Sequence, residues 1–477
     1  MTNRVAREQG TTLRIPRVLL VCGKYFVWYK FTGNRKAILG RRIRLACEEL
    51  GPVFIKFGQL LSTRYELISK EDSAELAGLL DKVPPISEET VRAIFLADFK
   101  KYPEELFKEF DTQPIASASI AQVYRAKLTT GEDVAVKIRR PNIQRTIKSD
   151  LAIIKSLLRL TKIFSRSLRQ IRMDVVVSQI EDWMFQETDF RREAENLRTV
   201  KKYVRRMQNG KNPYTHAIVI PDIHEEFLSD NVITMDFIDG VPMNKLELIK
   251  NNPEYDAVSS MKRFMNAVLY DWMHESDFYF HGDPHPANVL LLPNGRLALL
   301  DYGLLGHFEG RDCEETKDFI LAVYAGNVEE SIKVAVRMCR ADARFKGLIR
   351  KDVEDYLEQT EFAGLGFWFV GFIKIFIKHK MPLPYQLVLF ARMNALMENL
   401  AHLAMPGATT VEMIGEELER GLRKRILDNV LNTRLFPAVY ALTEKLKTTP
   451  ELAARLIDRY FDNPLQAVKD FREALRV

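Results

Sequence analysis

The chain has 477 residues, of which 47% are apolar and 28% are charged. This composition is typical of a globular protein and excludes disordered, fibrous and collagen-like chains, while the length allows two or three domains or one large elaborated domain. No run of uncharged apolar residues reaches the length of about 18 that a membrane-spanning helix needs. The four cysteines form no CxxC pair, so we predict no zinc or redox motif and expect a reducing compartment.

The positive excess of the chain, whose net charge is +6, lies in residues 1–45, because they hold eleven lysines and arginines and one acid, Glu8, whereas the rest is close to neutral. The same segment contains apolar and aromatic side chains, namely Val18, Leu19, Leu20, Tyr25, Phe26, Trp28, Tyr29 and Phe31. Such a mixture is typical of a segment that lies on an anionic membrane surface. A nucleic-acid-binding arm and a plain solvated face are the alternatives. No nucleic-acid motif accompanies the segment, so we favour the membrane and expect no nucleic-acid partner.

The apolar run from Val18 to Cys22 is too short for a secretory signal, and Lys24 interrupts its extension. We therefore expect a cytoplasmic protein that is peripheral on the inner membrane. Residues 1 to about 110 are predicted to be helical, with amphipathic spacing over Arg41–Tyr65 and Glu71–Leu80.

The periodicity then changes to that of paired strands, Val123–Leu128 and Asp133–Arg139, with a turn at residues 129–132. Val134, Val136 and Ile138 should point to one side of the strand. Lys137 should point to the other side, toward a cleft.

Further along, Asp150–Met207 is predicted to be helical, Ala217–Pro221 and Val232–Phe237 have strand length, and helix is predicted over Glu254–Ser276 and from Arg311 onward. The apolar stretch Gly364–Gly371 is predicted to be a buried or surface-docked helix. This order predicts an α+β, two-lobed protein-kinase-like fold with an N-terminal helical extension and a mostly helical C-lobe. We expect domains at 1–110, 111–240 and 241–477.

One polar pattern carries most of the chemistry. Asp283, Asn288 and Asp301 stand at kinase-like spacing within His281–Asn288 and Leu299–Gly303. Asp283 would orient a nucleophile, while Asn288 and Asp301 offer hard oxygen ligands to Mg²⁺. The alternative without a function is a simple turn capped by the aspartate, and the flanking apolar strands argue against it. A zinc site at His281 and His285 lacks a third ligand.

Lys137, in Val-Ala-Val-Lys, matches the lysine that holds the ATP phosphates in kinases. The preceding loop, residues 116–123, keeps the spacing of a kinase glycine-rich loop but has alanine in place of all three glycines. Because alanine disfavours positive φ, this loop should be stiffer. Glu193 is the best candidate partner for Lys137, although a charged helix face would also explain its cluster. Its distance in sequence from Lys137 predicts an insertion in the lobe.

The sequence resembles the UbiB/ADCK family of atypical kinase-like proteins. Four motifs carry the resemblance: the KxGQ motif at Lys56–Gln59, the alanine-rich loop Pro114–Val123, the ExD motif at Glu187 and Asp189 with Glu193 following, and His281–Asn288. The resemblance implies an ATPase that supports ubiquinone biosynthesis at a membrane and phosphorylates proteins poorly. The sequence departs from the family pattern at Tyr302, where Phe or Cys is common. It also lacks the C-terminal pair of hydrophobic spans that some bacterial relatives have.

The resemblance implies ATP and Mg²⁺ as cofactors, and quinone-biosynthesis lipids or enzymes as partners. Lys56 and Gln59 are expected to lie near Glu187 and Asp189, and all four are expected to act as regulatory residues over the cleft. The predicted nucleotide-binding residues are Ile115, Ala116, Ser117, Ala118, Ser119, Ile120, Ala121, Gln122, Val123, Lys137, Glu193, Met235 and Phe237.

Two other functions stay open. A small-molecule phosphotransferase of the aminoglycoside- or choline-kinase type shares the Asp283 motif but has no KxGQ helix. A non-catalytic nucleotide-binding scaffold would not need the intact Lys137, Asp283, Asn288 and Asp301.

Overall fold

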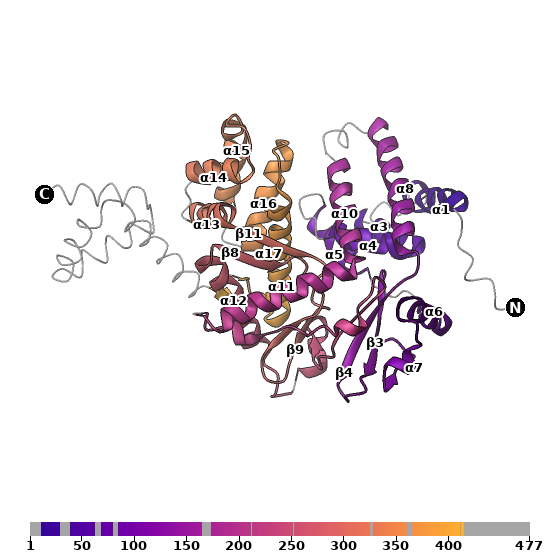
Figure 1. Ribbon diagram of the computed structural model, residues 1–477. Coiled ribbons are helices and arrows are strands. Elements are labelled where there is room, and N and C mark those ends of the chain that lie inside the picture. Colours follow the sequence, from indigo (N-terminus) through magenta and orange to yellow (C-terminus); the bar gives the residue numbers. More distant parts are fainter. Residues whose placement is uncertain are drawn as a thin grey trace, which may run out of the picture. The chain divides into compact units, whose positions relative to one another are not determined.

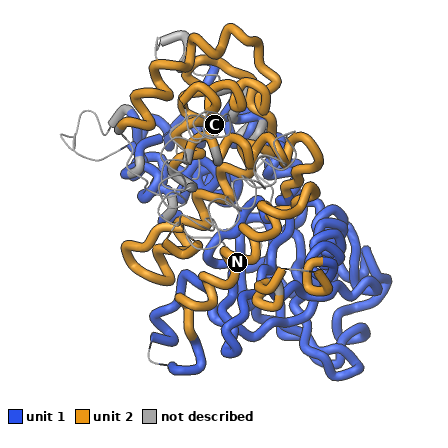
Figure 2. The backbone as a smooth tube through the Cα atoms, turned by 90° about the vertical axis from the view of Figure 1, so that its left-hand side faces the viewer, with its two compact units in different colours: residues 1–206, 218–255, 281–305 blue, residues 207–217, 256–280, 306–477 orange. Residues whose placement is uncertain are grey.

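The computed structural model describes residues 11–28, 39–62, 68–79, 84–164, 173–210, 212–250, 252–324, 328–359, 365–410 and 412–414. The fold is α+β and kinase-like, with helices preceding a small sheet and a mostly helical C-terminal part, as the sequence predicts (Figure 1). Two compact units divide the chain (Figure 2). Unit 1 comprises residues 1–206, 218–255 and 281–305, and unit 2 comprises residues 207–217, 256–280 and 306–477. The domain boundaries expected at 110 and 240 stay predictions. Tyr29, Phe31 and Tyr65 of the sequence analysis lie outside the described residues.

The N-terminal extension of unit 1 is helical. Its elements are α1 (Thr11–Cys22), the π-helix η1 (Gly23–Trp28), α3 (Leu39–Leu50), α4 (Pro52–Ser62), α5 (Lys70–Ala77), α6 (Glu88–Phe99) and α7 (Pro103–Leu106). The stretch predicted as helical from Arg41 contains two helices instead of one, because Gly51 interrupts it with φ +99°. Only glycine adopts that conformation readily, and Pro52 then begins the next helix at a position that proline favours.

A five-stranded antiparallel sheet follows, built from β1 (Glu109–Phe110), β2 (Ala116–Ser117), β3 (Ala121–Lys127), β4 (Asp133–Arg139) and β6 (Val232–Asp236). The order is β1-β3-β4-β6, and β2 pairs with β3. The predicted β3–β4 hairpin is confirmed, with Gly131 at φ +101° in its turn.

The two faces of this sheet have different neighbours. Val134, Val136 and Ile138 are fully buried and pack with Phe95 of α6 and Phe107 in one aromatic and aliphatic core. Lys137 alternates with these residues and points to the opposite face, as the pattern predicts.

Three α-helices of the described residues lie between β4 and β6, largely in the region Asp150–Met207 that is predicted to be helical, although the first begins earlier, at Ile143. They are α8 (Ile143–Phe164), α10 (Met173–Glu187) and α11 (Phe190–Gln208). The first two form the insertion that the long spacing between Lys137 and Glu193 predicts. α8 and α10 pack against each other and against α4 of the N-terminal extension.

A second sheet of unit 1 holds the polar motif near Asp283. Its order is β5 (Ile218–Val219), β10 (Leu297–Leu299), β9 (Val289–Leu291) and β7 (Val241–Pro242). β9 and β10 lie between Asn288 and Asp301 and correspond to the two apolar strands predicted there, Val289–Leu292 and Leu297–Leu300. β5 is shorter than the predicted strand Ala217–Pro221 and pairs in parallel with β10.

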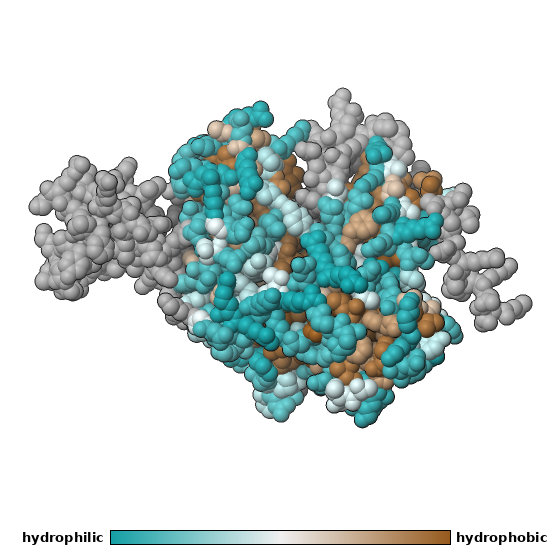
Figure 3. Space-filling view, in the orientation of Figure 1, coloured by the Kyte–Doolittle hydropathy of each residue, from teal (hydrophilic) through white to brown (hydrophobic). Residues whose placement is uncertain are grey.

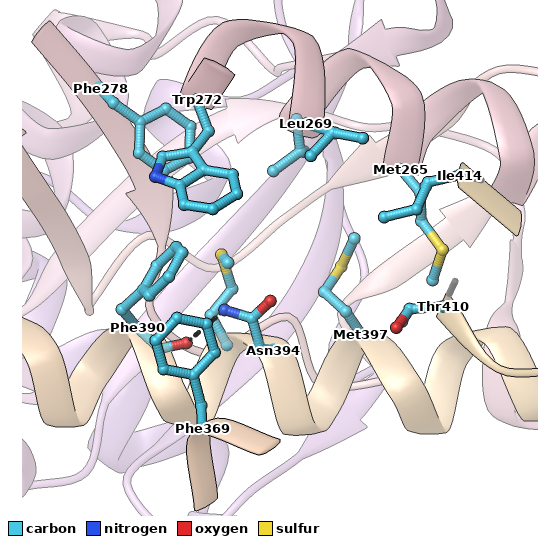
Figure 4. A pocket seen from close by; sticks show the side chains of 12 residues that line it. Met265, Leu269, Trp272, Phe278, Phe369, Phe390, Asn394, Met397, Thr410 and Ile414 are labelled. Carbon is cyan, nitrogen blue, oxygen red and sulfur yellow. Dashed lines mark hydrogen bonds between the residues drawn. The ribbon is translucent and has the colours of Figure 1, made fainter. Parts of the chain in front are cut away.

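Unit 2 is mostly helical. It contains α12 (Ala257–His274), α13 (Gly310–Tyr324), α14 (Val328–Met338), α15 (Phe345–Gln359), α16 (Leu365–Lys378) and α17 (Tyr385–Ala404), with a short pairing of β8 (Asp277–His281) and β11 (Leu305–Glu309). The predicted buried helix near residue 364 is α16, which buries Phe369, Phe372 and Phe376 and packs on α17. A small pocket of about 40 Å³ lies between α12 and α17, lined by apolar side chains such as Trp272, Phe390 and Met397 (Figure 4).

Candidate nucleotide and metal site

Lys137 lies at the centre of a buried ion cluster in unit 1. Its Nζ atom is 2.8 Å from Glu193 Oε1, 2.9 Å from Glu193 Oε2 and 3.2 Å from Asp301 Oδ2. The strand β4 projects the lysine from the sheet, and the first turn of α11 supplies the glutamate. Burial alone would lower the pKa of Lys137, but the carboxylates of Asp301 and Glu193 outweigh burial and raise it. The lysine is therefore charged and held at a fixed place.

Glu193 is 1% exposed, so its carboxylate depends on its neighbours. Burial raises the pKa of Glu193 to about 7, against the opposing effect of the Lys137 ammonium. The turn before α11 is tied to the sheet as well, because Arg139 donates to the carbonyl of Thr188 at 2.7 Å. Gln144 of α8 donates to the Thr188 hydroxyl at 3.1 Å. No sequence motif marks these supports, because Arg139 and Gln144 are ordinary polar residues on a strand and a helix.

Asp301 follows β10 and receives two kinds of contact. Its Oδ2 atom faces Lys137, and its Oδ1 atom accepts a hydrogen bond of 2.9 Å from the backbone N–H of Gly303. Burial alone would raise the pKa of Asp301, but the Lys137 ammonium and the Gly303 N–H outweigh it and hold the pKa well below its usual range. Its side chain keeps 36% exposure, so an ionised carboxylate oxygen remains open to a ligand.

The loop from His281 to Asn288 is shaped by its own backbone and side chains. The Asp283 N–H donates to His281 Nδ1 at 3.0 Å, so His281 braces the loop from within. The N–H of Gly282 donates to the carbonyl of Leu304, and the N–H of Leu300 donates to the carbonyl of Asn288. These bonds hold the loop beside the Asp301 segment. Asp283, Asn288 and Asp301 therefore come from one local structure.

The cluster has more negative than positive groups. The pKa of Glu187 is raised by burial, against the effect of Lys56, and the charges of Asp301 and Asp283 raise it further. Together with Glu193 there are four carboxylates, whereas Lys56 and Lys137 supply two ammonium groups. Such an excess favours a divalent cation.

The donors fit magnesium better than zinc. Asn288 and Asp301 offer amide and carboxylate oxygens, and Mg²⁺ commonly takes one or two carboxylates and completes its shell with water and nucleotide phosphates. No group of three or more His, Cys, Asp or Glu in the described part of the chain could hold a metal ion by itself. A cation here would therefore need the nucleotide as a further ligand.

The KxGQ helix α4 reaches the same cluster. Lys56 Nζ lies 2.6 Å from Oε2 of Glu187, which is the last residue of α10. Both side chains are largely buried. Gln59, one turn later, donates instead to the carbonyl of Leu79 at 3.0 Å. Gly58 lies against this segment, because a Cβ at this position would come within 2.4 Å of Leu79 Cδ1. The motif thus places one lysine at Glu187 and fixes its helix with the other two residues.

Asp189 has a local contact at the start of α11. Its carboxylate accepts from the backbone N–H of Arg192 at 3.0 Å, which is the position of a helix N-cap. The side chain is exposed. The ExD motif therefore combines a lysine-binding glutamate with a capping aspartate, and a regulatory role for Asp189 stays a prediction.

The alanine-rich loop forms a tight hairpin between β2 and β3. Ala116 pairs with Val123, and Ser117 pairs with Gln122, whose side-chain amide donates to the Ser117 hydroxyl at 2.9 Å. Ser119, Ile120 and Ala121 are buried, whereas Ile115 is 51% exposed. Arg140, which belongs to no predicted motif, donates from Nε to the Ala118 carbonyl at 2.9 Å. Packing and hydrogen bonds thus hold the loop, and its greater stiffness stays a prediction.

The strand register places several predicted nucleotide-binding residues on the Lys137 face. Val123 and Lys137 are direct neighbours across β3 and β4. Ala135 lies two residues before Lys137 on β4 and therefore on the same face of the sheet. Its direct neighbour on β6 is Met235, so Met235 shares this face. Phe237 follows β6, and its ring lies 4.4 Å from the guanidinium carbon of Arg125.

These features define a kinase-like protein with an alanine-rich loop in place of a glycine-rich one and an added helix at the Lys137 cluster. Residues 78–335, more than half of the chain, match the family described as the ABC1 atypical kinase-like domain. The chain belongs to this family of atypical kinase-like proteins, which includes the UbiB proteins, as the resemblance indicates.

Curated relatives agree with the assignment. The chain is 28% identical over 442 residues to the "Probable protein kinase UbiB" of Xylella fastidiosa, covering 88% of this chain and 74% of that protein. It is 29% identical to the protein of the same name from Pseudomonas paraeruginosa, covering 86% and 77%. An uncharacterized protein of Mycobacterium tuberculosis is 32% identical over 275 residues, which span 58% of this chain and about half (54%) of that protein.

Among solved structures, a complex of a Mycobacterium tuberculosis protein with erythromycin has 21% identity, a TM-score of 0.43 and coverage of 73% of this chain and 91% of that one. In the described ranges, no helix has both the length and the apolar character needed to cross a membrane.

Proposed function

We propose that this chain binds ATP with Mg²⁺ and hydrolyses it as an atypical kinase, in support of ubiquinone or a related isoprenoid quinone. The observation that carries the proposal is the buried contact of Lys137 with both Glu193 and Asp301. A lysine held between a helix glutamate and the aspartate of a metal-binding motif is the arrangement that kinases use to position nucleotide phosphates.

Each residue then has a role that its surroundings support. Lys137 would hold the phosphates, and the β2–β3 hairpin would cover them. Asp283 would orient the attacking water or acceptor hydroxyl as a hydrogen-bond acceptor. Asn288 and Asp301 would hold the magnesium, which neutralises phosphate charge when bound.

The position of Lys56 favours ATP hydrolysis over transfer to a protein. Its helix α4 contacts Glu187 beside the Lys137 cluster, and the family resemblance implies that this helix covers the place where a protein acceptor would dock. The same contact argues against a small-molecule phosphotransferase of the aminoglycoside- or choline-kinase type, since those enzymes have no such helix.

Location at an anionic membrane surface is the second part of the proposal. On α1, Ile15, Leu19 and Leu20 are 48%, 51% and 74% exposed, and apolar side chains appear over this helix in Figure 3. The neighbouring Arg17 is exposed as well. An exposed apolar helix face beside basic residues is the composition of an interfacial helix. Quinone precursors partition into the same lipid phase.

The proposal is tested by ATP turnover and quinone content. Purified full-length chain should hydrolyse ATP in the presence of Mg²⁺, faster with anionic vesicles than with neutral ones. Cells that carry only the Lys137→Ala or Asp301→Asn chain should lose quinone. A third set of cells carries only the Asp283→Asn chain, and an unchanged quinone content in them would support a non-catalytic scaffold. A stable phosphorylated product in a metabolite screen would support a small-molecule phosphotransferase.

A further inference from the structure

One hydrogen bond of α11 lies outside every motif of the sequence. Asn196 stands three residues after Glu193, so both side chains leave the same face of the helix. The side-chain amide of Asn196 donates to the backbone carbonyl of Tyr302 at 2.8 Å. The two residues are 106 positions apart in the sequence, and this bond joins the glutamate-bearing helix to the Asp301–Gly303 segment.

The Tyr302 carbonyl belongs to the same peptide unit as the Gly303 N–H. A trans peptide is planar, and its C=O and N–H groups point in opposite directions. The carbonyl accepts from Asn196, while the N–H donates to Asp301 Oδ1 at 2.9 Å. Asn196 therefore fixes the plane whose other end orients the metal-binding carboxylate.

The other oxygen of Asp301 is supported from the same helix. Oδ2 faces Lys137, and Lys137 is held by Glu193. Both carboxylate oxygens thus depend on α11, one through the Lys137 ammonium and one through the Tyr302–Gly303 peptide. The Tyr302 ring is fully buried, which leaves this peptide little freedom apart from rotation of its plane.

We propose that Asn196 is a positioning residue for the metal-binding carboxylate of Asp301. It acts through the Tyr302–Gly303 peptide and does not touch the metal or the nucleotide. An amide suits this position because it donates to a carbonyl without adding charge beside four carboxylates. The proposal rests on the proposed nucleotide and magnesium site.

Two variants and a control test it in the full-length chain. Asn196→Leu removes the donor at similar volume, and Asn196→Gln keeps an amide. Arg198→Ala, on the same helix, removes only an exposed ion pair with Glu225. Binding of a fluorescent ATP analogue is titrated at increasing Mg²⁺ and, separately, without divalent metal. Thermal unfolding of each variant is recorded in parallel.

The half-saturating Mg²⁺ concentration should rise about tenfold in Asn196→Leu, as is common when a group that orients a metal ligand is removed. Affinity for the metal-free nucleotide should change less than about twofold, because Lys137 and the hairpin stay in place. Asn196→Gln should recover part of the Mg²⁺ affinity, and Arg198→Ala should match the wild type.

Equal Mg²⁺ dependence in Asn196→Leu and the wild type would overturn the positioning role alone, since the wild type would still bind magnesium and nucleotide. If Asn196→Leu lost metal-free nucleotide binding in parallel with its Mg²⁺ response, the role of Asn196 would be merely structural. That result would also overturn the positioning role. A wild-type chain without Mg²⁺-dependent nucleotide binding would overturn the proposed site together with this inference.

Discussion

At the scale of single residues, the proposed site depends on two charged side chains that are buried together. Lys137 and Glu193 are both largely withdrawn from water and pair directly. Such a pair adds little net stability when intact, but removing one partner leaves an uncompensated charge. The sequence predicts this pair through the family resemblance, although Glu193 stands 56 residues from the lysine.

Replacement of Lys137 by methionine should lower the free energy of unfolding by about 3 kcal/mol, because Glu193 then lacks its ammonium partner. The double variant Lys137→Met with Glu193→Leu should regain most of this stability but should not regain nucleotide binding. Urea denaturation and a nucleotide titration measure the two effects. Full stability in the single variant would contradict the buried pair.

The pH dependence of Glu193 has an unusual sign. Its pKa is raised from 4.5 to about 7 in the folded chain, mainly by burial, so the folded state binds this proton more tightly than the unfolded state. Its contribution to stability is therefore fullest below pH 4.5 and is lost as the pH rises through 7. Relative to Glu193→Gln, the wild type should lose stability between pH 5 and 7. Urea midpoints across this range test the sign, and a gap that is constant with pH would contradict it.

Tyr302 carries a cost that the sequence does not reveal. The pattern of the family predicts little effect of tyrosine in place of phenylalanine. The Tyr302 hydroxyl, however, is buried and finds no hydrogen-bond partner in the described part of the chain. Tyr302→Phe should therefore raise the free energy of unfolding by about 1 kcal/mol.

Tyr124 provides the matched control. It is also buried, but its hydroxyl donates to Gln122 Oε1 at 2.7 Å. Tyr124→Phe should lower stability by about 1 kcal/mol, since an acceptor loses its donor. Equal effects of the two substitutions in thermal unfolding would show that the Tyr302 hydroxyl is satisfied.

At the scale of elements, local sequence patterns predict the hairpin and the loop, whereas contacts between elements far apart in the sequence cannot be predicted from such patterns. The β3–β4 hairpin follows from alternation and Gly131, and the Asp283 loop follows from the two apolar strands beside it. The break at Gly51 was missed because helical spacing continues on both sides of it. Arg139, Gln144, Arg140 and Asn196 were missed as well, since their contacts join elements far apart in the sequence.

The KxGQ helix depends on a close approach at Gly58. Gly58→Ala would place a Cβ within 2.4 Å of Leu79 Cδ1 and 3.2 Å of Cys47 Sγ. The forced shift should cost about 1–3 kcal/mol and should loosen the contact between Lys56 and Glu187. Gly347→Ala in α15 is the control, because no atom lies within 4 Å of the added group. If both substitutions left the thermal midpoint unchanged or raised it, the close packing of α4 would be wrong.

At the scale of the whole molecule, the N-terminal helix α1 is tied into unit 1. Arg14 of α1 holds Asp150 of α8 through two hydrogen bonds of 2.8 and 2.6 Å, and Asp150 is fully buried. Val18 and Val21 are buried too, while Leu19 and Leu20 remain exposed. The basic segment therefore serves partly as structure, which composition alone did not indicate.

The exposed face of α1 should mediate membrane binding. Leu19→Glu with Leu20→Glu should reduce sedimentation with anionic vesicles several-fold, because charge at this face opposes insertion. Leu248→Glu is the control, since Leu248 is 70% exposed but lies in the helix Met243–Ile249, outside the N-terminal segment. An equal loss in both variants, or no loss in either, would exclude α1 as the membrane contact.

The proposed site for ATP and magnesium depends on Asp301 and Lys137. A calorimetric titration of the full-length chain with ATP, with and without Mg²⁺, for the wild type and Asp301→Asn tests this site. Mg²⁺ should strengthen binding to the wild type at least tenfold and should have little effect on Asp301→Asn, whose amide lacks the negative charge of the carboxylate. The same Mg²⁺-dependent affinity in both chains would contradict it.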